Sequence, residues 1–177
     1  MQRNDGTVRV WDPFVRVFHW SLVLSYALAW ATGDERAWLH ERAGYFILVL
    51  IGLRAIWGLV GTRHARFSDF VFRPSRTLDY LKSLMTGNAR RYLGHNPAGG
   101  WMVIVLLIGL LGTGVSGVLI DGAGKETWEE IHEGFANFTL LLVVIHVSGV
   151  VVSSLLHREN LVRAMLTGNK PRSSADV

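Results

Sequence analysis

Four histidines lie in or beside long apolar stretches of this chain of 177 residues, where an imidazole is a costly side chain. They are His19, His40, His132 and His146. His132 and His146 are fourteen residues apart in one apolar segment. On an α-helix this spacing corresponds to about 21 Å of rise and close to four whole turns. We therefore expect both imidazoles on nearly the same face of one helix, at two different depths.

Bis-histidine haem ligation is the chemistry that this pattern favours. A b-type haem is held by one imidazole on each side of its iron, and the two ligands come from helices that face each other in a bundle. A single buried histidine more often has a structural role, but four at matched depths favour ligation. Zinc is a weaker alternative, because the chain contains no Cys and no H-E-x-x-H motif.

The composition indicates a membrane protein. Half of the residues are apolar, and they gather in runs of about 20 residues with few charges. The absence of Cys excludes disulfides, iron–sulfur clusters and covalent haem attachment. In such a chain a net charge of +4 reflects membrane topology, and we predict no nucleic-acid partner.

We predict one all-α domain over residues 1–177, a four-helix transmembrane bundle with two haems in its core. The predicted spans are residues 14–32, 39–61, 101–120 and 134–156, each long enough to cross about 30 Å of hydrocarbon. No cleavable signal peptide is apparent, so the first span is expected to be retained. Short amphipathic helices are predicted in the loop 62–100 and in the tail 157–177.

Lysine and arginine give the expected orientation. They gather in three segments, namely the leader (Arg3, Arg9, Arg16), the loop 62–100 (Arg63, Arg66, Arg73, Arg76, Lys82, Arg90, Arg91) and the tail (Arg158, Arg163, Lys170, Arg172). The positive-inside rule then places both termini and the middle loop in the cytoplasm. His19 and His146 fall on the cytoplasmic side, and His40 and His132 near the periplasmic face. We predict that these are the two ligand pairs.

Three further residues are candidates for cofactor binding. Arg54 lies fourteen residues after His40, inside a span, and its guanidinium suits a haem propionate; the alternative is that it snorkels to the membrane surface. Arg16, one turn before His19, could assist. His95, in the sequence "GHNPAGGW", could contact a quinone headgroup or a propionate, or could belong to a structural turn.

Several motifs resemble bacterial di-haem cytochrome b561 proteins and the related b-type cytochrome subunits of nickel–iron hydrogenases. They are "FHW" (18–20), "LHERAGY" (39–45), "LRAIWGLVGTRHARFSDFV" (53–71), "LGHNPAGGWM" (93–102) and "IHEGFANFTLLLVVIHVSGV" (131–150). The resemblance covers nearly the whole chain. It implies a four-helix bundle in the bacterial inner membrane, haem ligation by the four histidines, and electron transfer between a quinone pool and a partner redox protein.

Three functions are open at this point. The chain could pass electrons between quinone and a periplasmic c-type cytochrome or dehydrogenase subunit, it could be a superoxide:ubiquinone oxidoreductase, or it could be a haem-bearing membrane anchor subunit of a hydrogenase or other dehydrogenase. The expected periplasmic connections are net acidic, with Asp34, Glu35, Glu41, Asp121, Glu126, Glu129, Glu130 and Glu133 against Arg36, Arg42 and Lys125. Such a face repels superoxide and attracts a basic partner, which favours the first function. A homo-oligomer is also compatible with the sequence.

Overall fold

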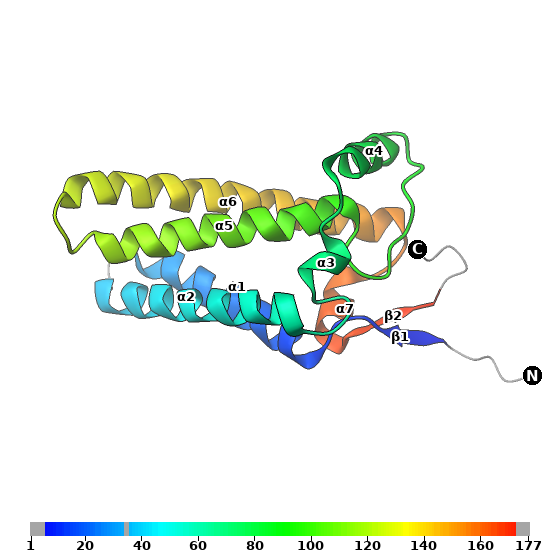
Figure 1. Cartoon of the computed structure of the whole chain (residues 1–177), viewed down its shortest axis with the longest axis horizontal. Helices are drawn as coiled ribbons and strands as arrows, with labels where there is room; N and C mark the ends of the chain where they lie inside the picture. Colours follow the sequence, from blue (N-terminus) through cyan, green and yellow to red (C-terminus); the bar gives the residue numbers. More distant parts are fainter. Residues whose placement is uncertain (1–5, 34–35, 173–177) are drawn as a thin grey trace, which may run out of the picture. The chain divides into compact units, whose positions relative to one another are not determined.

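The computed structural model describes residues 6–33 and 36–172, which are largely α-helical (Figure 1). In chain order the elements are β1 (Thr7–Arg9), α1 (Pro13–Thr32), α2 (Ala37–Val60), α3 (Phe67–Phe70), α4 (Pro74–Met85), α5 (Pro97–Leu119), α6 (Lys125–Leu156), α7 (Leu161–Thr167) and β2 (Asn169–Pro171).

Four of the helices, α1, α2, α5 and α6, are long and apolar enough to cross a membrane, which confirms the predicted fold class. Helix α5 begins at Pro97 rather than Trp101, because Asn96 caps it by accepting a hydrogen bond from the Gly99 amide at 2.7 Å. Helix α6 begins at Lys125 rather than Gly134, since its first turns are polar and hydropathy alone does not detect them. The ion pair between Lys125 and Glu129, 3.5 Å long, lies in this polar extension.

The chain divides into two compact units, which we describe separately. The bundle unit comprises Val17–Ile56 and Val103–Ile145. Its core contains Ile47 and Ile51 from α2 and Leu110 from α5, against which Leu22, Tyr26 and Leu107 pack. Apolar side chains from three long helices thus meet in one cluster.

Glycines of α5 allow the neighbouring helices of the bundle unit to approach closely. A Cβ atom added at Gly109 would lie 2.7 Å from Thr139 Oγ1 of α6, and one at Gly112 would lie 2.5 Å from the Phe135 ring. The two helices lie side by side in Figure 1. Small residues at such a contact are typical of membrane helices, which gain most of their association energy from close packing.

The terminal unit comprises Met1–Arg16, Trp57–Met102 and His146–Val177. Within its described residues, β1 pairs antiparallel with β2, with Val8 opposite Lys170. The sequence did not predict this pairing, because strands of three residues show no clear alternation. The same unit has a buried cluster of Val10, Trp11 and Val15, which follow β1 in the chain, together with Ala65.

Asp12 joins the start of α1 to the end of α2 in this unit. One carboxylate oxygen accepts from the Val15 amide at 2.9 Å, and the other accepts from Trp57 Nε1 at 3.1 Å and Thr62 Oγ1 at 2.6 Å. Burial raises the pKa of Asp12, but these hydrogen bonds outweigh it and hold the pKa below its ordinary value. Asp12 is therefore an N-cap that also fixes a tertiary contact.

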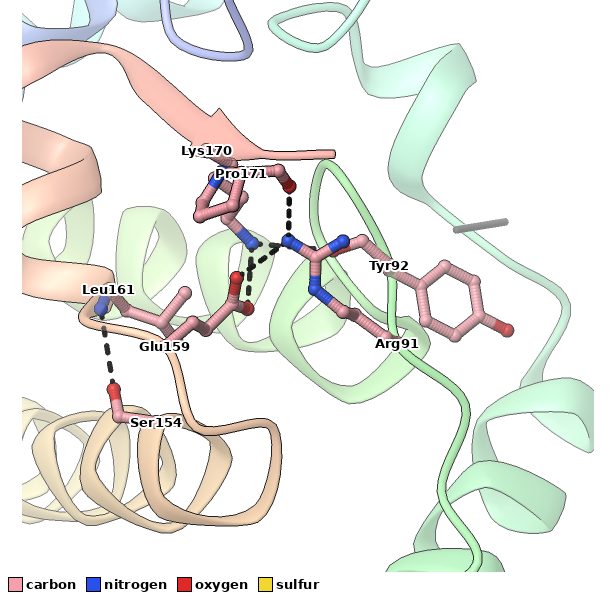
Figure 2. A network of polar contacts seen from close by, with 7 residues as sticks. All are labelled: Arg91, Tyr92, Ser154, Glu159, Leu161, Lys170 and Pro171. Carbon is pink, nitrogen blue, oxygen red and sulfur yellow. Dashed lines mark hydrogen bonds and ion pairs between the residues drawn. The ribbon is translucent and has the colours of Figure 1, made fainter. Parts of the chain in front are cut away.

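A buried charge cluster holds the C-terminal strand to the loop before α5 (Figure 2). Glu159 accepts from Arg91 at 2.9 Å and from Lys170 at 3.2 Å, and Arg91 also donates to the Pro171 carbonyl at 2.9 Å. The three charged side chains are between 3% and 9% exposed. Burial lowers the pKa of Lys170, whereas Glu159 acts in the opposite direction.

Candidate functional site

The structure brings His40 and His132 together in the bundle unit. His40 lies in the first turn of α2 and His132 in the second turn of α6. Their ring centres are 5.9 Å apart and the ring planes are inclined at 78°. Both side chains are half-buried. Two imidazoles from different helices thus face one small region of the bundle.

Each of these rings is oriented by a backbone carbonyl. His40 Nδ1 lies 2.9 Å from the Ala29 carbonyl oxygen, and His132 Nδ1 lies 2.8 Å from that of Thr113. A carbonyl only accepts, so each Nδ1 carries a proton, and in the neutral ring this leaves the lone pair on Nε2. This is the arrangement in which metal-ligating histidines are usually held, because the second hydrogen bond fixes the tautomer and the ring orientation.

The spacing of the rings fits a metal atom between them. With metal–imidazole bonds of about 2 Å, and ring nitrogens about 1 Å from the ring centres, two imidazoles on opposite sides of one metal have centres about 6 Å apart. The observed separation is 5.9 Å. No group of three or more His, Asp or Glu side chains within residues 6–33 and 36–172 has the geometry to hold a metal ion. Two imidazoles alone are a donor set that suits the two axial positions of a b-type haem.

Gly117 of α5 leaves room for the His132 ring. A Cβ atom at this position would lie 3.1 Å from both Cε1 and Nδ1 of His132. The sequence does not distinguish Gly117 from the other glycines of α5, because only the packed structure shows which glycine lies beside a histidine.

His19 and His146 are the predicted pair at the other depth. His19 lies in α1, half-buried, with its ring centre 5.1 Å from that of Trp20. His146 is half-buried in α6, on the same uninterrupted helix as His132. His19 belongs to the bundle unit and His146 to the terminal unit, and their pairing stays a prediction.

The two candidate arginines have different surroundings. Arg54 is only 2% exposed in α2. Arg16 donates a hydrogen bond from its guanidinium to the Leu166 carbonyl of α7. Its Nε is buried, and no acceptor within the described part of the chain reaches that atom. Arg16 thus has one donor engaged by the tail and another that an anionic group could use.

His95 lies in an aromatic environment within the terminal unit. Its ring centre is 4.8 Å from that of Trp11 and 4.6 Å from that of Phe70. It also lines a cavity of about 190 Å³ together with residues of the 62–100 loop. Nearby, a Cβ atom at Gly100 would lie 2.1 Å from the Phe70 carbonyl oxygen, so the start of α5 is packed tightly against α3.

Two structural features were missed by the sequence reasoning. Asp12 had a local signal, since Asp followed by Pro before an apolar run is a typical helix start. The cluster of Arg91, Glu159 and Lys170 had none, because Arg91 and Glu159 are 68 residues apart and only the folded chain brings them together.

Four membrane-spanning helices with facing imidazoles define a multi-pass membrane protein whose donor set suits haem. The family model described as prokaryotic cytochrome b561 matches residues 10–168, so the chain belongs to this family and is a b-type cytochrome.

Curated relatives are similar over most of their length. A protein of Rhizobium leguminosarum bv. viciae named "Probable Ni/Fe-hydrogenase B-type cytochrome subunit" is 23% identical over an alignment that covers 93% of this chain and 89% of the relative. One of the same name from Azotobacter vinelandii is 21% identical, with 94% and 89% covered. No solved structure matches the chain.

Proposed function

We propose that this cytochrome holds two b-type haems and transfers electrons between the membrane quinone pool and a periplasmic redox partner. The observation that carries the proposal is the His40–His132 pair, with ring centres 5.9 Å apart and both Nδ1 atoms bound to backbone carbonyls. This geometry leaves two Nε2 lone pairs available for one iron. Bound haem supplies the one-electron redox chemistry, which the polypeptide itself lacks.

The second haem would be held by His19 and His146. Support comes from the spacing along α6, where His146 follows His132 by fourteen residues and so presents its imidazole on nearly the same helix face about 21 Å further along. Both side chains are half-buried in otherwise apolar helices, where uncompensated imidazoles are costly. Two cofactors at these depths would give electrons a path between the two membrane faces.

Three residues are proposed to position the propionates and the quinone. Arg54, buried at 2% exposure in α2, would form a bidentate pair with a haem carboxylate. Arg16 would assist through its buried Nε. His95 would contact a quinone headgroup or a propionate from its place beside Trp11 and Phe70.

The exposed charged residues that flank His40 and His132 in the chain are mainly acidic, and we call them the acidic rim of the bundle unit. Its exposed described residues are Glu41, Asp121, Glu126, Glu129, Glu130 and Glu133, against Arg36, Arg42 and Lys125; Asp34 and Glu35 lie outside the described residues. Lys125 is paired with Glu129, and Arg42 lies over the Trp38 ring at 5.3 Å. The rim would therefore attract a basic surface and repel an anion such as superoxide.

The partner is proposed to be a periplasmic hydrogenase or other dehydrogenase subunit, or a c-type cytochrome. The relatives' names refer to nickel–iron hydrogenases, which supports the first choice. The distribution of Lys and Arg supports an inner-membrane location with both termini cytoplasmic, so that the acidic rim faces the periplasm.

The proposal is tested by the haem content of the purified chain and of single histidine variants. We expect two haems per wild-type chain by the pyridine haemochrome assay, and loss of a different haem in His40→Ala and in His146→Ala. His64→Ala, outside the predicted ligand set, is the control and should keep both. One haem in the wild type would limit ligation to one pair, and no haem would refute the proposal.

A membrane anchor function is the second candidate, because the relatives are named as subunits. It predicts that the haem-loaded chain alone does not exchange electrons with quinol, whereas the electron-transfer function predicts reduction of both haems by quinol. A superoxide:ubiquinone oxidoreductase would instead reduce ubiquinone with superoxide at a rate close to the diffusion limit.

A further inference from the structure

The terminal unit contains a cationic cavity, of whose lining residues the proposed electron-transfer function uses only His95. It has a volume of about 190 Å³, and its polar lining includes Arg63, His64, Arg76 and Tyr92. This volume is below the range of about 300–1,000 Å³ typical of pockets for drug-sized ligands. The cavity therefore suits a small polar group rather than a whole cofactor.

The charges around the cavity favour an anion. Asp69 also lines it, but its carboxylate is paired with Arg66 at 3.0 Å. Arg63 and Arg76 form no ion pair with an acidic side chain of the described residues. The Arg76 guanidinium lies 4.8 Å from the centre of the Phe72 ring, which holds it in place at the cavity. Two guanidinium groups in such a position are suited to bind a phosphate.

The position of the cavity in the chain favours the phosphate of a lipid headgroup as the ligand. The connection that forms it leaves one membrane span at Val60 and enters the next at Pro97, so both of its ends lie at the same membrane face. Within it, α4 exposes Leu78 (58%), Leu81 (41%) and Met85 (89%). Exposed apolar side chains on a short basic helix beside two membrane spans are typical of a helix that lies in the lipid headgroup region.

We propose that Arg63 and Arg76 bind the phosphate of an anionic phospholipid, with α4 lying in the same leaflet. Tyr92 would donate from its hydroxyl; its ring points away from the Arg91 cluster in Figure 2 and packs 5.9 Å from Phe72. The seven Lys and Arg residues of the 62–100 loop would add attraction to an anionic leaflet.

The test uses the haem-loaded full chain in detergent, with bound lipid counted by native mass spectrometry. We expect phosphatidylglycerol to be retained about tenfold more strongly than phosphatidylcholine, and this preference to be lost in an R63Q/R76Q double variant. The control K82Q/R90Q removes the same charge from the same loop but alters no cavity residue, and should keep the preference. Y92F should weaken retention by a few fold, and it provides a second test if the double variant does not fold.

Three results would overturn the proposal. Equal retention of phosphatidylglycerol by the wild type and R63Q/R76Q would show that the cavity does not bind lipid. Binding of inorganic phosphate as tight as that of the lipid would identify the ligand as a free anion. A rise in the quinol KM of R63Q/R76Q without a change in lipid retention would identify a quinone site. Haem content and reduced spectra, which report on the proposed electron-transfer function, should be the same in all variants.

Discussion

Replacing Gly117 with alanine tests whether the His132 ring must stay where the backbone holds it. The added Cβ would lie 3.1 Å from two atoms of the ring, whereas non-bonded carbon atoms pack best at about 3.5–4.0 Å. The ring must therefore shift by a few tenths of an ångström, which strains its 2.8 Å hydrogen bond to the Thr113 carbonyl. Disturbing the groups that orient a metal ligand typically costs about 10–100-fold in affinity. We expect the haem held by His40 and His132 to bind at least about tenfold more weakly.

Gly134→Ala is the matched control for this substitution. Both glycines lie inside long helices, so alanine brings a similar gain in helix propensity of about 1 kcal/mol. A Cβ atom at Gly134, however, meets no atom within 4 Å. Haem-to-protein ratios and potentiometric titrations of both variants would separate the two effects. We expect Gly117→Ala to lose or shift only one of the two haem transitions, and Gly134→Ala to keep both.

Identical haem content and identical midpoint potentials in the two variants would contradict this expectation. In that case the His132 ring would not be a ligand held by its Thr113 contact, or the ring would move without consequence. Loss of both haems in Gly117→Ala alone would point to a general packing defect, which the thermal midpoint of the variant would reveal.

Three further predictions concern the terminal unit. Glu159→Gln leaves two buried cations without a counter-charge, which typically costs about 3–5 kcal/mol of folding stability. We therefore expect faster proteolysis of the C-terminal tail in this variant, and an unchanged cleavage rate would contradict the prediction. The pKa of Asp12 is lower in the folded chain than in the unfolded chain. The ionised carboxylate therefore stabilises the fold fully above its unfolded pKa, and this stabilisation is lost as the pH falls through the folded pKa. The thermal midpoint should fall more steeply below about pH 4 in the wild type than in Asp12→Asn. Gly168 has a φ of 85°, and a Cβ atom there would lie 2.7 Å from the Trp11 carbonyl oxygen. Gly168→Ala should lower the thermal midpoint more than Gly124→Ala, which has a φ of 81° and open space around it; equal effects would show that only the backbone strain of about 1–2 kcal/mol matters.

The positions of the long helices could be read from the sequence because hydropathy is a local property. In a membrane, each run of apolar residues forms a helix because a helix pairs the backbone N–H and C=O groups of the run with one another, without hydrogen bonds to neighbouring segments. The polar first turns of α6 and the capped start of α5 were missed, since hydropathy does not report on polar helical residues. The pairing of β1 with β2 was missed because each strand has only three residues.

The candidate site, like the fold, could be predicted from the sequence only in part. The sequence placed four histidines on apolar helices and, through the expected topology, at two depths. It could not show that His40 is oriented by the Ala29 carbonyl, or His132 by that of Thr113, because both acceptors belong to other helices. It also gave no sign of which glycine faces His132, or that Arg16 contacts the tail.

Local patterns in the sequence are therefore enough for the membrane class and the four long helices, and they predict the depth and helix face of each imidazole. These follow from composition and from the fixed rise and twist of an α-helix, which act within one segment. The folded chain is needed to show which nitrogen of His40 and His132 contacts a carbonyl, which side chains line the cationic cavity, and how Glu159 meets Arg91 and Lys170. These contacts join segments that are distant in the sequence, and packing between segments, rather than any local pattern, brings them within hydrogen-bonding distance.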